Sequence, residues 1–209
     1  MTVTQAQLDA LWDFGDAAGS EGRLREAAQA ATDAATRAEL ETQIARALGL
    51  QGRFDEADAL LDAIPAEVAT AEAAVRVRIA LERGRLRNSG GDPDGALALF
   101  REATEAAASD LVFLRVDGLH MLAIADPDRA EAWTAEALEA LEDVDDARTL
   151  RWRVSLHNNA GWARFDAGRV AEAIVEFERA KDAATCWGTP QQVAWADEAL
   201  AEARAALGG

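Results

Sequence analysis

Glycines recur at one spacing in a sequence that otherwise favours helices. Gly161 and Gly168 lie seven residues apart in NNAGWARFDAGRVAEAIVEFERA (158–180). A glycine inside a helix costs about 1 kcal/mol relative to Ala, so repeated use at one spacing indicates a structural need. Small or turn-forming residues form four more pairs with this spacing: Gly15/Gly22, Ala45/Gly52, Gly84/Gly91 and Gly118/Ala125. Eight of the chain's 15 glycines occupy these ten positions, where a random distribution over 209 residues would place fewer than one.

Alanines and prolines extend the pattern. An alanine lies five residues after each second position, at Ala27, Ala57, Ala96, Ala130 and Ala173. The third and fourth copies are 34 residues apart, and Pro93 and Pro127 keep the same offset. A period of about 34 residues is typical of helix-turn-helix units that stack into solenoids.

With these motifs the chain resembles the tetratricopeptide repeat (TPR) family over nearly its whole length. In that family a small residue lies midway along the first helix of each pair, a glycine at the turn and alanines in the second helix. Residues 45–64, 84–103 and 158–180 match this pattern well, and 118–137 matches less well. The sequence departs from the family pattern at Ala31, Arg87, Thr134 and Arg164.

The resemblance implies an all-α fold, an α-solenoid of about five helix pairs wound into a right-handed superhelix. We expect a single domain over 1–209. The predicted repeats cover 5–35, 36–66, 70–108, 110–142 and 146–186, and a capping helix covers 190–207 after the break at Gly188-Thr189-Pro190. The irregular spacing of the copies predicts longer helices or connections near 65–72 and 143–150.

Two kinds of residue have specific expected roles in these pairs. Gly161 would let a neighbouring helix approach closely, and Gly168 would adopt the left-handed conformation that ends a helix. Asp92-Pro93 and Asp126-Pro127 would each begin a second helix, with Asp as the cap and Pro in the first turn.

Charge and composition exclude several partners. The formal net charge is -17, so phosphate backbones and anionic lipids are repelled, and we expect neither a nucleic-acid nor a membrane partner. The N-terminus lacks the basic and apolar regions of a signal peptide, and no apolar run approaches the roughly 20 residues of a membrane span. These features predict a cytoplasmic protein.

Cys186 is the single cysteine, so no intrachain disulfide can form. We favour its interpretation as a small buried hydrophobic residue.

The sequence contains no recognisable catalytic constellation. His120 and His157 are the two histidines and have no metal-ligand spacing, so packed or rim histidines are favoured. DPDG at 92–95 lacks the further ligands of a calcium loop. We therefore expect no enzyme, no catalytic residue, no metal site and no cofactor.

Two basic stretches stand out in this acidic chain. Residues 75–87 contain five Arg and one Glu, and 147–165 contain four Arg and no acid. The family resemblance implies that first helices line a concave groove. The predicted peptide-binding residues of that groove are Arg46, Arg78, Arg85, Arg115, Asn158 and Trp162. Arg pairs bidentately with carboxylates and Asn binds peptide backbones, so the expected partner is an acidic or C-terminal peptide.

Two alternatives stay open for these residues. In the first alternative, the arginines neutralise Glu and Asp on adjacent helices instead of binding a ligand. In the second, Trp162 is a packing residue rather than a binding platform. The main functional hypothesis is a non-enzymatic scaffold or adaptor that binds another protein or peptide. The alternative is a bacterial-type regulatory sensor for a small anionic ligand or signalling peptide. The six Trp also make a homodimer plausible.

Overall fold

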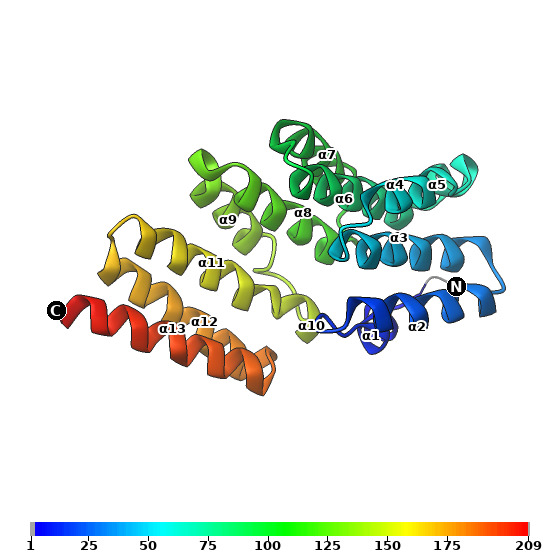
Figure 1. Cartoon of the computed structure of the whole chain (residues 1–209). Coiled ribbons are helices and arrows are strands. Elements are labelled where there is room, and N and C mark those ends of the chain that lie inside the picture. Colours follow the sequence, from blue (N-terminus) through cyan, green and yellow to red (C-terminus); the bar gives the residue numbers. More distant parts are fainter. Residues whose placement is uncertain (1–2, 209) are drawn as a thin grey trace. The chain divides into compact units, whose positions relative to one another are not determined.

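The computed structural model describes residues 3–208, which form helices and no β-strand. The helices that begin in the first half of the chain are α1 (Gln5–Leu11), α2 (Ala17–Ala30), α3 (Ala34–Leu50), α4 (Phe54–Asp62), α5 (Ala66–Ala71), α6 (Ala73–Ser89) and α7 (Pro93–Ala106). Those that follow are α8 (Val112–Ala125), the 3-10 helix η1 (Pro127–Arg129), α9 (Ala130–Glu139), α10 (Ala147–Leu150), α11 (Trp152–Asp166), α12 (Val170–Trp187) and α13 (Pro190–Gly208). The all-helical prediction is confirmed (Figure 1). None of these helices is both long and apolar enough to span a bilayer.

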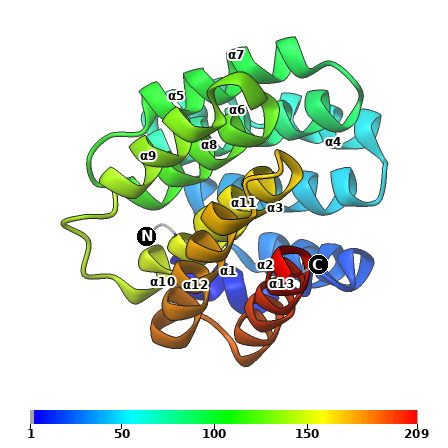
Figure 2. The same ribbon diagram turned by 90° about the vertical axis from the view of Figure 1, so that its left-hand side faces the viewer.

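The chain divides into two compact units, one up to Asp126 and one from Pro127 onward. In the first unit, helices that follow one another pack together: α2 with α3, α3 with α4, α6 with α7 and α7 with α8. In addition, α3 packs on α6 and α6 on α8, so the first helices of successive pairs are neighbours. Figure 2 shows α6, α7 and α8 side by side.

The second unit contains η1 and the helices from α9 to α13. Here α12 packs against both α11 and α13, and α9 contacts α11 (Figure 1). Its core includes Ala173 and Phe177 of α12 together with Leu200 and Ala203 of α13, all fully or almost fully buried.

Each predicted repeat range overlaps at least two helices. Residues 36–66 overlap α3 and α4, 70–108 include α6 and α7, and α13 covers the expected cap at 190–207. The two segments predicted to hold longer helices or connections, 65–72 and 143–150, contain the short helices α5 and α10. A five-repeat solenoid in a single domain stays a prediction.

The expected roles of the glycines are confirmed at the best-matching copy. A Cβ atom added to Gly161 of α11 would lie 2.4 Å from the ring of Phe177 on α12, so the missing side chain makes room for that ring. Gly168, between these helices, has φ of 75°, a conformation that L side chains rarely adopt. The α6–α7 pair repeats the close approach, since a Cβ atom added to Gly84 would lie 2.4 Å from the ring of Phe100.

In the first copy the predicted register is wrong by seven residues. Gly22 was expected at the turn but lies exposed inside α2. The connection between α1 and α2 contains Gly15, and Leu24, nine residues later, is fully buried in the core, as Phe177 is nine residues after Gly168. Seven residues are nearly two helical turns, so a shift of seven residues leaves the same residues on almost the same face of the helix. The sequence pattern therefore does not distinguish the two registers.

The two Asp-Pro predictions have different outcomes. The Asp92 carboxylate accepts a hydrogen bond from the backbone N–H of Gly95 at 3.0 Å, and Pro93 is the first residue of α7, as expected. After Asp126, however, Pro127 begins the 3-10 turn η1, and α9 starts only at Ala130. The tighter 3-10 turn displaces the start of this second helix by three residues.

We predict that Gly161→Ala destabilises the protein, because the new methyl group meets the buried ring of Phe177. Overpacking of this kind costs about 1–3 kcal/mol, measurable by urea denaturation. Gly22→Ala is the matched control, since a Cβ there meets no atom within 4 Å. That variant should gain up to about 1 kcal/mol from helix propensity. A Gly161→Ala protein as stable as the wild type would contradict the close approach.

Candidate functional site

Three of the predicted groove arginines meet in one buried cluster in the first unit. Arg46 comes from α3, and Arg78 and Arg85 come from α6. Three acids lie among them, one each from α3, α6 and α8: Glu39, Glu82 and Asp117. We call these six residues the charge cluster. Its formal charges balance, so Arg46, Arg78 and Arg85 are neutralised by acids on the same and adjacent helices.

Helical periodicity explains why these side chains converge. Residues three, four and seven apart share one face of a helix. On α3 this spacing relates Glu39, Gln43 and Arg46, and on α6 it relates Arg78, Glu82 and Arg85. Since α3 packs on α6 and α6 on α8, the charged faces lie against one another.

Arg85 forms the shortest ion pairs of the charge cluster. Its guanidinium donates to the Glu82 carboxylate at 2.6 Å and to the Asp117 carboxylate at 2.5 Å. Burial raises the pKa of Asp117, but the positive charges of Arg85 and Arg46 outweigh it and hold that pKa below its usual value. Burial alone would lower the pKa of Arg85, but the negative charges of Asp117 and Glu82 have the larger effect. The pKa of Arg85 is therefore raised. Both directions favour the charged forms.

The pair between Arg78 and Glu39 is less well satisfied. The Arg78 Nε and Glu39 Oε2 atoms are 3.5 Å apart, and Glu39 Oε1 and Arg78 Nε are buried without a hydrogen-bond partner among the described residues. A second nitrogen of Arg78 donates to the Gln5 side chain at 3.2 Å. Burial raises the pKa of Glu39 and lowers that of Arg78, so desolvation opposes both charges. Within the charge cluster, the desolvation of this pair is therefore poorly compensated by its electrostatic attraction.

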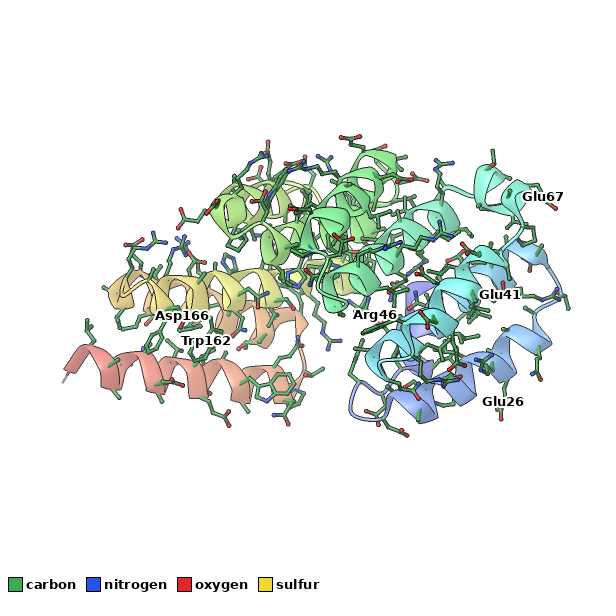
Figure 3. The ribbon with its side chains drawn as sticks, turned by 45° about the horizontal axis from the view of Figure 1, so that its top comes forward. Glu26, Glu41, Arg46, Glu67, Trp162 and Asp166 are labelled. Carbon is green, nitrogen blue, oxygen red and sulfur yellow. The ribbon has the colours of Figure 1, made fainter. Side chains whose placement is uncertain are left out.

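Arg46 lies at the exposed edge of the charge cluster, beside two aromatic rings. Its side chain is 26 % exposed and its link to Glu82 is long, at 3.7 Å. The guanidinium lies over the ring of Phe14, 5.7 Å from the ring centre. Phe14 is 67 % exposed and stacks on Trp12 with centroids 4.9 Å apart, and the Trp12 indole N–H donates to Gln43 at 3.1 Å. We call Trp12, Phe14, Gln43 and Arg46 the aromatic rim; Figure 3 labels Arg46.

The other predicted groove residues do not join this cluster. Arg115 is half-buried on α8, two residues before Asp117 and hence on the opposite side of that helix. Asn158 and Trp162 belong to α11 in the second unit. Trp162 packs edge-to-face on Phe177 with centroids 5.0 Å apart and contacts the core shared with α13 (Figure 3). It therefore serves as a packing residue, the alternative left open by the sequence.

The second unit has a buried charged group of its own. His157 Nδ1 lies 2.7 Å from a carboxylate oxygen of Glu176, and Arg164 lies 2.6 Å from the other oxygen. Burial raises the pKa of Glu176, but the hydrogen bond with His157 and the charge of Arg164 outweigh it and lower that pKa to about 2. His157 is thus a packed histidine, as expected.

His120 and Cys186 complete the set of candidate reactive residues. Burial lowers the pKa of His120 to about 4, so its imidazole is neutral at pH 7. Cys186 is exposed near the end of α12, so the expectation of a buried cysteine is wrong. Its position shortly before the break at Gly188 leaves the thiol outside the core formed by α12 and α13. Within residues 3–208, no three His, Cys, Asp or Glu side chains gather as metal ligands would.

The comparisons with known proteins show the fold alone. No family model and no curated protein sequence matches the chain. Among solved structures, the crystal structure of BtubC (BKLC) from P. vanneervenii is similar, with a TM-score of 0.58 and 19 % sequence identity. The match covers 99 % of this chain and 94 % of that one. The TM-score over nearly the whole of both chains indicates a similar fold.

We predict that Arg78→Met strongly destabilises the protein, because it leaves Glu39 buried without its cation. Breaking a buried pair in this way costs about 3–5 kcal/mol. Replacing both partners, as Arg78→Met with Glu39→Leu, should restore stability to near or above that of the wild type. Urea denaturation of the three proteins measures the difference. A double variant as unstable as the single one would show that the charges themselves stabilise the fold.

A second prediction concerns acid stability. The folded-state pKa of Glu176, about 2, is below its ordinary value of 4.5. Its contribution is therefore fully present above about pH 4.5 and is lost as the pH falls toward 2. Glu176→Gln should be less stable than the wild type at pH 7 by on the order of 3 kcal/mol, and the gap should narrow below pH 4.5. Glu178→Gln is the control, because Glu178 is exposed and pairs with Arg204 at the surface. A gap for Glu176→Gln that does not change with pH would refute this account.

Proposed function

We propose that the chain is a TPR-like repeat protein, wound as a right-handed superhelix, that binds a segment of another protein without catalysing a reaction. Helix pairs in every predicted range, the close approaches at Gly84 and Gly161, and the packing of α3 on α6 and α6 on α8 support this. The binding surface comprises the charge cluster on α3, α6 and α8 and the aromatic rim, whose rings lie between α1 and α2.

The aromatic rim is the observation that carries the proposal. Phe14 is largely exposed, yet its ring is held by stacking on Trp12, which is itself held by Gln43. Such a rigid aromatic surface loses little conformational entropy when a partner binds. Trp and Arg are also the residues most enriched at the energetic centres of protein interfaces.

The charges of the cluster suggest how a partner is recognised. Arg78 and Arg85 are buried or nearly so and occupied by acids, so they support the site rather than contact a ligand. Arg46 has the longest ion pair of the three, to Glu82, and the most exposed side chain. A partner's carboxylate, from an acidic side chain or a C-terminus, can pair with Arg46 while an apolar neighbour packs on Phe14.

The test is selection of binders from a random peptide library displayed with free C-termini. We expect the wild type to enrich peptides with a carboxylate next to an apolar side chain. Phe14→Ala and Arg46→Gln should each weaken binding of those peptides by about tenfold, the effect of losing a contact of roughly 1.4 kcal/mol. Because Phe14 is exposed, its substitution tests binding with little effect on folding.

Arg101→Gln is the matched control. Arg101 of α7 is also partly exposed and has a similarly long ion pair, 3.8 Å to Asp126, but lies away from the rim. The Arg101→Gln protein should bind the selected peptides as tightly as the wild type does. Peptides that bind all variants equally, or a library that yields no binders, would overturn the proposed site.

A further inference from the structure

A cavity of about 200 Å³ lies among α2, α3 and α4, away from the aromatic rim. Its lining residues are Arg25, Ala28, Gln29, Arg37, Glu41, Ile44 and Leu60. A helix turns by about 100° per residue, so Arg37, Glu41 and Ile44 lie on the face of α3 opposite to Glu39, Gln43 and Arg46. Both Glu41 and Arg46 are labelled on α3 in Figure 3. The proposed peptide surface therefore does not include this cavity.

The base of the cavity is apolar. Ala28 and Ile44 are buried members of the core of the first unit, and Leu60 packs against that core from α4. Three aliphatic side chains from three helices give a surface on which a small apolar group can lose its contact with water. A fully hydrated ion, such as inorganic phosphate, would gain nothing from this surface.

The exposed edge of the cavity carries two arginines. Arg25 pairs with the Glu21 carboxylate at 2.8 Å, and Arg37 donates to the carbonyl oxygen of Ala31 at 3.0 Å. Each guanidinium has five N–H donors, so both have donors left for a further acceptor. Their planar, delocalised charge suits a carboxylate, which can accept two parallel hydrogen bonds.

Glu41 lies half-buried in the wall of the cavity. Burial raises the pKa of Glu41, although the charge of Arg37 opposes the shift. The lining holds two arginines and one acid, and Arg25 also pairs with Glu21 just outside the lining. The remaining N–H donors of the two guanidinium groups, rather than a net positive charge, therefore favour an anionic ligand, and Glu41 opposes it.

We propose that this cavity binds a small organic carboxylate with a short aliphatic group. The carboxylate lies between Arg25 and Arg37, and the aliphatic group contacts Ala28, Ile44 and Leu60. The volume is below the roughly 300–1,000 Å³ of pockets for drug-sized ligands, so only a small molecule or one terminal residue of a peptide fits. A free acid and an aliphatic C-terminal residue offer the same chemistry.

Methyl NMR titration of the full chain tests this site, because Ile44 reports from its base. The probes are isovalerate, its neutral amide isovaleramide, and the amine isobutylamine. Isovalerate should shift the Ile44 methyl signals in a saturable way, while those of Ile124 and Ile174 stay unchanged. Isovaleramide should bind at least tenfold more weakly, since charge-assisted hydrogen bonds contribute about 1.5–3 kcal/mol.

Variants assign the contributions of the charged residues. Arg37→Gln should weaken isovalerate binding by about tenfold, whereas Arg76→Gln should not change it. Arg76 is the matched control because its guanidinium also donates to a backbone carbonyl, that of Thr70. Glu41→Gln should tighten binding, because it removes the opposing negative charge.

A terminal-residue probe distinguishes the two ligand sources. N-acetyl-leucine that binds more tightly than isovalerate would identify a peptide C-terminus, and the reverse order would identify a free acid. Equal binding of acid and amide, tighter binding of the amine, no effect of Arg37→Gln, or no shift of Ile44 would each overturn the proposal. None of these results depends on the aromatic rim, so the two sites are tested independently.

Discussion

The arrangement of each helix pair depends on how closely its two helices can approach. In α6–α7 and α11–α12 an aromatic ring of the second helix occupies the space that a side chain of the first would fill. Gly84 and Gly161 provide that space, and Phe100 and Phe177 fill it completely, since both rings are fully buried. The contact aligns each pair along its length. In the first unit, the first helix of each pair then packs with another face against the first helix of the following pair, as α3 does on α6 and α6 on α8.

This packing brings charged faces together in the first unit. Burying ions is costly, and the charge cluster shows two different outcomes of that cost. Arg85 and Asp117 form short hydrogen bonds and stabilise each other's charges. Arg78 and Glu39 are a longer pair, in which desolvation opposes both charges. Arg46, the third arginine, has the most exposed side chain of the three, and we propose that it contacts a ligand.

The two faces of α3 differ in chemistry, and this gives one helix two possible binding roles. One face carries Gln43 and Arg46 beside exposed aromatic rings. The other carries Arg37 and Glu41 above an apolar base. Both faces combine a partly exposed arginine with an apolar contact, and the second also borders the cavity of about 200 Å³. We therefore propose a peptide segment as the ligand of the first face and a small acid as the ligand of the second.

Helix positions and glycine roles could be predicted from sequence because they depend on local chemistry. A glycine at a positive φ, an Asp that caps a helix and a buried Phe each leave a signal within a few residues, as at Gly168, Asp92 and Phe177. The register of the first copy could not be predicted, because a seven-residue shift preserves the face of a helix and only packing distinguishes Gly15 from Gly22. The aromatic rim was missed because nothing local relates Phe14 to Arg46, 32 residues later.

Sequence alone was enough to predict that the chain is helical, that α7 begins at Pro93, and that Gly161 and Gly168 lie at a helix contact and at a turn. What the charged residues do depends on how the helices pack. The arginines of 75–87 give a strong positive signal in sequence, but Glu39 and Asp117 come from other helices and neutralise two of them, Arg78 and Arg85. Electrostatic energy depends on distance in space, and sequence fixes such distances only within a helix. Whether an arginine binds a ligand or an internal acid is therefore decided by how the helices pack.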